Sequence, residues 1–400
     1  MSIISLPELN LLHQPGDDIS KTYEQIHALS STGIFRSPDD NGLIVTSFAA
    51  LQTLRKSPHL EALRRDFNKS GTGAIGAQAQ LASYTPFFVN DPLHTPLATA
   101  THEPFSPKHQ DAIARRFATC VKDTLQSMEQ KETCDLVEDF ARTITRRYWM
   151  KEIGAPPSMD DAFNTWSAAF IPMLAFESSQ AQVDTANHAA EDMWTYLLEL
   201  AKTASKDSLL IRMTHCLRHL PESHQNGANV IAAITFDGID SAASAIANIL
   251  YVVLRDEKLQ ASLRHNPKQL DNALREALRL EPPLPGLHRG TTAPVTYEGI
   301  DIPQGINIFM AWGCGNRDPR AYDAPNEFRL ERKNRTILSF GGGRRFCKGR
   351  TLALVQCKVA LELLFKHTEW IELIKQPKWS PPGSIRTVCE LESKVSCEPN

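Results

Sequence analysis

The most informative segment of this 400-residue chain is Phe340-Gly341-Gly342-Gly343-Arg344-Arg345-Phe346-Cys347-Lys348-Gly349. Three consecutive glycines let the backbone pass close to a flat or bulky group. A helix is predicted to follow, from about Gly349 to His367, and its free N–H groups, with the three basic residues of the stretch, favour a thiolate at Cys347. For a lone cysteine near glycines a plain buried-cysteine loop is the alternative, but the full spacing Phe-x-x-Gly-x-Arg-x-Cys-x-Gly disfavours it.

Composition is that of an ordinary soluble globular protein, with 42% hydrophobic and 22% charged residues and a net charge of −3. This charge gives no reason to expect nucleic acid as a partner, and the N-terminus shows no signal-peptide pattern. The eight cysteines lack paired metal-ligand spacing and are expected to be reduced. The most apolar segment, 230–254, is predicted to be a buried helix and not a membrane span, because polar residues costly in lipid interrupt it: Asp237, Asp240, Ser241 and Asn248.

Helical periodicity dominates the chain. Apolar residues at spacings of three and four predict helices over 108–280 and 349–367. Short apolar runs with Gly and Pro punctuation predict a β-rich portion over 30–70 and 289–310. Residues 70–90 are rich in Gly, Ala, Ser and Gln and are predicted to form a long loop. With no repeat or biased linker, we expect a single, mainly α domain with a small β portion.

These motifs resemble those of the cytochrome P-450 family of haem-thiolate monooxygenases. The glycine-rich stretch fits the family's haem-binding signature at every fixed position. Glu276 and Arg279 fit its Glu-x-x-Arg helix, in which the spacing places both residues on one face, and Arg332 follows a segment that resembles the meander whose arginine completes this ion-pair network. The resemblance covers about residues 30–395. It implies the P-450 fold, with haem between the central long helix and the cysteine-ligand loop.

The resemblance also implies the cofactor contacts. Haem b, iron protoporphyrin IX, would be held through its iron by the Cys347 thiolate, with O2 as co-substrate. Arg345 and Arg289 occupy positions that bind haem propionates. The haem-contacting residues implied are Cys347, Arg345, Arg289, His94, Phe340, Gly341 and Gly349. His94 fits a His-x-x-x-Arg helix in which Ala98 replaces the arginine; His102 is a candidate substitute, and an ordinary surface histidine remains the alternative for His94.

The central helix carries the implied catalytic pair. Asp240 takes the place of the family's acid and Ser241 that of its usual threonine, a pair that delivers protons during oxygen activation. Asp237 shares their helix face, where a carboxylate is costly unless paired. Asp237 therefore either contacts a basic or hydroxylated substrate or bonds to backbone or water. Further substrate-pocket candidates, for which core packing is the alternative, are Phe87, Phe88, Ile234 and Leu287.

The implied function is that of a cytoplasmic oxidoreductase of secondary metabolism, which inserts one oxygen atom from O2 into a small organic substrate. The chain has no length for a fused reductase, so electrons are expected from a separate ferredoxin or flavodoxin with its reductase. A basic patch would steer such an acidic donor, unless it is only a solvated charged face: Arg344, Lys348, Arg350, Lys358, Arg115 and Arg116. A peroxide-driven peroxygenase and a haem-thiolate ligand-binding or sensor protein without turnover remain alternatives.

Overall fold

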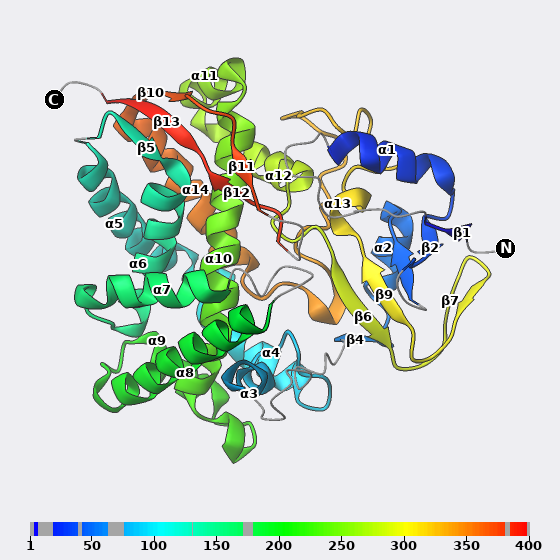
Figure 1. Cartoon of the computed structure of the whole chain (residues 1–400), viewed down its shortest axis with the longest axis horizontal. Helices are drawn as coiled ribbons and strands as arrows, with labels where there is room; N and C mark the ends of the chain where they lie inside the picture. The colour runs from blue at the N-terminus through cyan, green and yellow to red at the C-terminus, as the bar shows by residue number, and fades with distance from the viewer. Residues whose placement is uncertain are drawn as a thin grey trace. The chain divides into compact units, whose positions relative to one another are not determined.

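The computed structural model describes residues 4–6, 19–38, 42–62, 76–129, 131–170, 179–380 and 385–397, without the side chains of residues 4, 236, 237 and 397. The chain divides into two compact units. Figure 1 labels their helices and strands. Unit 1 comprises Met1–Arg64, Asn248–Cys347 and Pro377–Cys389. Unit 2 comprises Arg65–Ala247, Lys348–Gln376 and Glu390–Asn400.

Unit 1 is built on a six-stranded sheet. Its strand order is β1 (Ile4–Ser5), β2 (Ile34–Arg36), β3 (Leu43–Val45), β9 (Asn307–Met310), β6 (Leu287–Thr291) and β4 (Leu60–Ala62). The pairs β1–β2 and β3–β9 are parallel, and the other pairs are antiparallel. Two small ribbons add β7 (Val295–Tyr297) to β8 (Ile300–Ile302) and β11 (Lys378–Trp379) to β12 (Val388–Glu390).

Three helices of unit 1 pack apolar residues against this sheet: α1 (Ile19–Leu29), α2 (Phe48–Leu54) and α13 (Trp312–Gly315). The unit also contains α11 (Glu257–His265) and α12 (Leu270–Leu280). Helix α2 begins after Ser47, whose side chain accepts a hydrogen bond from the Ala50 N–H and caps the helix as its sequence predicts. One apolar core contains Leu51, Ile308 and Leu338, and this core fixes the position of the segment that leads into the Cys347 loop.

Unit 2 is predominantly helical. Its helices are α3 (Ala77–Leu81), α4 (His94–His102), α5 (Gln110–Met128), α6 (Thr143–Ile153), α7 (Asp160–Phe170), α8 (Gln180–Thr203), α9 (Leu209–Leu217), α10 (Gly227–Leu254) up to Ala247, and α14 (Arg350–His367), which packs against α5. A three-stranded antiparallel sheet joins β10 (Thr368–Leu373), β13 (Glu392–Cys397) and β5 (Thr133–Asp135). Short 3-10 helices of this unit occur at Ala82–Tyr84, Glu103–Phe105, Pro107–His109, Pro157–Met159 and Glu222–His224, and unit 1 has two more, at Pro267–Gln269 and Gly343–Arg345.

Helix α10 is the one described helix that is long and apolar enough to cross a membrane, and 81% of its most apolar window is buried. Its polar residue Asn248 is fully buried and donates to the Glu281 and Arg386 carbonyls at 3.2 and 2.9 Å. The Asn248 side-chain oxygen accepts from the Val388 N–H at 3.0 Å. A polar group satisfied in this way is compatible with a helix of the protein core, as predicted.

The predicted mainly α fold with small sheets is confirmed, with two corrections. The expected unbroken helical region 108–280 contains strand β5, because Glu392–Lys394 of β13 pair with it. A π-helix, Leu136–Arg142, follows this strand. It is capped by Asp135, whose side chain accepts a hydrogen bond from the Val137 N–H. The predicted loop 70–90 contains α3 and a 3-10 turn, although its first residues, 70–75, lie outside the described part.

Candidate functional site

The Cys347 loop closes on itself in unit 1. The Cys347 N–H donates to the Phe340 carbonyl at 3.0 Å, and the Gly341 N–H donates to the Leu338 carbonyl at 2.8 Å. Gly341 and Gly343 have φ of +65° and +60°, in the left-handed region that favours glycine. Among the described free cysteines, Cys347 alone is exposed. The loop therefore presents a single accessible thiol just before helix α14.

Arg55, at the end of α2, anchors this loop, a contact that sequence reasoning missed. Its Nη1 donates to the Gly341 carbonyl at 2.6 Å. A Cβ on Gly342 would lie 2.4 Å from Arg55 Cδ, and one on Gly343 would lie 2.3 Å from the Arg55 carbonyl oxygen. The close approach that the glycines allow is thus made, at these two positions, by the protein's own α2 segment.

A cluster of arginines lies beside the loop. Arg344 and Arg345 each form an ion pair with Glu61 of β4, one on each carboxylate oxygen. Glu61 is buried, and the side chain of Arg345 is 8% exposed. Arg289 of β6 is also buried, and the strand register places it opposite Ala62 of β4. Burial, followed by repulsion from Arg345, lowers the pKa of Arg289 to about 10, although Glu61 opposes this shift. The described part of the site thus holds buried cations that an anionic group would stabilise.

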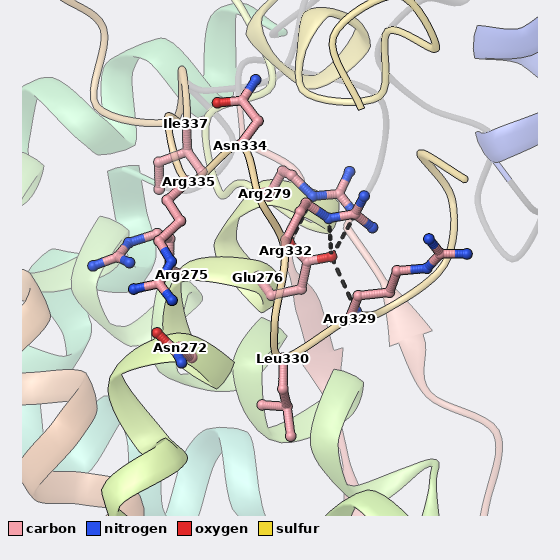
Figure 2. Close-up of a pocket in the computed structure, with 10 residues that line it drawn as sticks. All are labelled: Asn272, Arg275, Glu276, Arg279, Arg329, Leu330, Arg332, Asn334, Arg335 and Ile337. Carbon is pink, nitrogen blue, oxygen red and sulfur yellow. Dashed lines mark hydrogen bonds and ion pairs between the residues drawn. The ribbon is translucent and has the colours of Figure 1, made fainter. Parts of the chain in front are cut away.

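Glu276, Arg279 and Arg332 form the expected ion pairs, as Figure 2 shows. Arg279 reaches both carboxylate oxygens of Glu276 at 2.8 Å, and Arg332 Nε reaches one of them at 2.8 Å. Burial alone would raise the pKa of Glu276, but hydrogen bonds and charge from the two arginines outweigh it and lower this pKa. The three residues join α12 to the 323–332 segment and fix the backbone that precedes the loop.

The predicted residues of α10 lie in unit 2. Asp240 is buried, Ser241 is half-buried and Ile234 is buried. The side chain of Asp237 lies outside the described residues, so its predicted role stays a prediction. Gly238 has a packing role that the sequence did not indicate, because a Cβ there would lie 2.3 Å from Trp149 Cζ2.

The remaining predicted contacts divide between the units. His94 is buried at the start of α4, and the rings of Phe87 and Phe88, in the same unit, meet edge to face at 4.6 Å between centroids. Leu287, half-buried, belongs to unit 1. His102 bonds through Nδ1 to the Lys348 carbonyl at 2.8 Å, which makes Nδ1 the donor. His102 thereby holds the residue that follows Cys347.

Two residues of the predicted basic patch are neutralised by ion pairs. Arg116 pairs with the buried Glu152, and Arg344 pairs with Glu61. A different basic surface surrounds the Glu276 network, where Arg275 and Arg335 line a pocket (Figure 2) and form no ion pair with any described residue. Sequence reasoning missed this surface because its arginines come from two segments that only the fold brings together.

Comparisons with known proteins agree on one family. The family model described as Cytochrome P450 matches residues 207–388. Cytochrome P450 144 of Mycobacterium tuberculosis is 28% identical over 84% of this chain and 81% of its own length. 6-Deoxyerythronolide B hydroxylase of Saccharopolyspora erythraea is 25% identical over 87% of this chain and 88% of its own length. The chain belongs to the cytochrome P450 family.

The fold of this cytochrome P450 matches solved members closely. A crystal structure of P450BioI, in complex with an acyl carrier protein ligated to hexadec-9Z-enoic acid, superposes with a TM-score of 0.85 at 22% identity, covering 94% of this chain and 98% of that one. The family assignment makes the chain a monooxygenase oxidoreductase that uses haem iron with cysteine thiolate ligation and O2.

The residues present fit such a cofactor. Buried Arg289 and Arg345, whose side chain is 8% exposed, carry positive charge of the kind that haem carboxylates would require. Among the described residues no group of three His, Cys, Asp or Glu side chains could hold a metal ion. The exposed Cys347 thiol would supply the cysteine ligand of a haem iron.

Proposed function

We propose that this cytochrome P450 inserts one oxygen atom from O2 into a small organic substrate, with electrons from a separate ferredoxin or flavodoxin and its reductase. Haem b is the proposed cofactor, and Cys347 is its proposed thiolate ligand. The observation that carries the proposal is the exposed Cys347 thiol at the end of a closed glycine loop, with the buried Arg289 and the largely buried side chain of Arg345 in the same unit.

Each proposed residue has a separate task. Bound haem supplies the oxygen activation, which no side chain can perform. Arg345, Arg289 and His94 would hold the carboxylates of the cofactor, and Phe340, Gly341 and Gly349 would shape the loop beneath it. Asp240 and Ser241 would hold and pass protons, a task for which a buried carboxyl and a half-buried hydroxyl one residue apart are suited.

The absorption spectrum of the reduced protein under carbon monoxide tests the proposed ligand. The wild-type protein should show the strongly red-shifted Soret band of a thiolate-ligated carbonyl. Cys347→Ala should lose this band, whereas the matched variant Cys389→Ala, which changes a half-buried cysteine of the same unit, should keep it. A wild-type band at the shorter wavelength of a histidine or neutral ligand would contradict the proposal.

An acidic electron donor is proposed to bind the arginine-lined pocket of unit 1. Arg275 is half-buried, Arg335 is exposed, and the one carboxylate that lines the pocket, Glu276, is already bound by buried arginines. The surface therefore keeps an excess of positive charge that can steer an acidic protein.

The salt dependence of electron transfer tests this surface. In the double variant Arg275→Glu and Arg335→Glu, the rate of haem reduction by a ferredoxin should fall roughly tenfold or more at low salt and lose most of its dependence on ionic strength. Arg218→Glu, an exposed charge reversal in unit 2, serves as the control. Equal rates in both variants would place the donor elsewhere.

Biosynthetic intermediates are the proposed substrate class. The relatives include a biotin-biosynthesis P450 and a polyketide-biosynthesis P450 of Bacillus subtilis, and the superposed P450BioI was solved with an acylated carrier protein. Spin-state titration with fatty acyl and polyketide compounds tests this class. In Asp237→Asn, unchanged affinity for the compounds that bind would remove Asp237 from the substrate contacts.

A further inference from the structure

Glu61 lies at the junction of a strand and the Cys347 loop. It is the middle residue of β4, where the antiparallel register sets it opposite Gly290 of β6. Only 7% of Glu61 is exposed. Its two carboxylate oxygens are divided between consecutive arginines of the loop, with Oε1 accepting from Arg344 and Oε2 from Arg345. A fixed strand thus holds the two loop arginines through one buried carboxylate.

The charges around Glu61 are unequal. The side chain of Arg345 is 8% exposed, and its charge is one of the causes that lower the pKa of the buried Arg289. Glu61 acts on Arg289 in the opposite direction and favours its cation. Like charges in a poorly hydrated site repel strongly, so a carboxylate among them lowers the cost of keeping them together. Glu61 is therefore placed to keep both guanidinium groups charged and close before any further anion arrives.

We propose that Glu61 is a positioning residue for haem: it holds Arg345 and stabilises Arg289 for the cofactor's carboxylates, and its own charge lowers the reduction potential of the bound iron. This inference rests on the proposed binding of haem by Arg345 and Arg289. In a competing arrangement, Glu61 would bind the arginines in place of the cofactor's carboxylates. Substitution of Glu61 would then strengthen haem retention, whereas the proposal predicts that it weakens haem retention.

Three substitutions separate geometry from charge. Glu61→Ala removes both, Glu61→Gln keeps nearly the same shape without the charge, and Glu61→Asp keeps the charge on a shorter side chain. The control is Glu327→Gln, because Glu327 is an exposed carboxylate that also pairs with an arginine, Arg329. Far-UV circular dichroism selects the variants that are folded, and Glu61→Gln retains the size of the side chain if Glu61→Ala does not fold.

Haem transfer from the purified holoenzyme to excess apomyoglobin and the spectroelectrochemical midpoint potential are then measured. We expect haem loss to accelerate roughly tenfold or more in Glu61→Ala and Glu61→Gln, because this is the effect of losing one charge-assisted hydrogen bond. Both variants should also show a more positive potential, because a negative charge that opposes reduction is gone. Glu61→Asp should keep a potential near that of the wild type and lose haem at an intermediate rate.

Slower or unchanged haem loss in the Ala and Gln variants would overturn the inference. Faster haem loss with an unchanged reduction potential would also overturn it, because Glu61 would then be only a structural partner. The wild-type carbon monoxide spectrum separates this failure from a failure of the proposed function. With the thiolate band present, the Glu61 result bears on Glu61 alone; without that band, the proposal for Cys347 fails first.

Discussion

Two buried glutamates of unit 1, Glu276 and Glu61, each pair with two arginines, yet only the Glu61 cluster has a third buried arginine beside it. Arg279 directs its donors to Glu276 and to the carbonyls of Asn316, Pro325 and Glu327. Arg332 adds the carbonyls of Asp323 and Ala324 to its contact with Glu276. The remaining donors of Arg279 and Arg332 are thus satisfied by carbonyl oxygens of the protein itself.

The Glu61 cluster includes a third guanidinium, Arg289, whose cation is disfavoured by burial and by Arg345. The comparison teaches that an arginine–carboxylate cluster can serve two purposes. A cluster closed by backbone carbonyls stabilises the fold, whereas a cluster with surplus buried positive charge is suited to an incoming anion. The predictions below test this distinction.

Glu276→Gln should have the largest effect. It leaves Arg279 and Arg332 buried without their counter-charge, which costs about 3–5 kcal/mol of unfolding free energy when a buried pair is broken. Guanidinium chloride denaturation followed by circular dichroism measures this loss. A cost below about 1 kcal/mol, the range of exposed pairs, would mean that the carbonyl contacts alone hold the arginines.

The same cluster should govern stability at acid pH. Because the pKa of Glu276 is lower in the folded protein than its ordinary value, the carboxylate stabilises the fold above the unfolded pKa. This stabilisation is lost as the pH falls through the folded pKa. Thermal unfolding between about pH 3 and 7 should therefore show a steeper acid loss in the wild type than in Glu276→Gln. Parallel curves would contradict the assignment.

Arg289→Met should act in the opposite direction in the haem-free protein. Removing this buried cation from a cluster that holds surplus positive charge is expected to raise the unfolding free energy by about 1 kcal/mol near neutral pH. Since the folded pKa is about 10, below the ordinary value of 12.5, the wild type regains this stability as the pH rises above 10 and the advantage shrinks. Denaturation at two pH values measures it, and haem retention by the variant should fall. A destabilised haem-free variant would show that Arg289 is already satisfied by the protein.

Arg329→Gln should have the smallest effect. Its side chain pairs with Glu327 in an exposed position, although its backbone N–H reaches Glu276. Substituting the side chain leaves that backbone contact, so the change in unfolding free energy should stay below about 0.5 kcal/mol. A larger loss, measured by the same denaturation, would extend the Glu276 cluster to the pocket rim.

Much of the secondary structure followed from local patterns. Apolar periodicity predicted helix α14 to within one residue. The helical prediction for the residues of β5 was wrong, because this short sequence carries no strand signal that outweighs the helical patterns around it. It becomes a strand through pairing with β13, more than 250 residues later. The spacing of Glu276 and Arg279 was visible in the sequence because a helix brings residues three apart onto one face.

The sequence alone determined the cysteine loop, the order of the motifs, the long buried helix and the family, since each depends on residues close together in the chain or on a matched pattern. Only the tertiary structure decided which charges meet. Glu61 and Arg345 are separated by 284 residues, and Arg55 and Gly341 by 286. Such contacts are set by strand register and by the closure of long loops. No local pattern encodes either, so the acid that partners the haem-loop arginines became visible only in the folded chain.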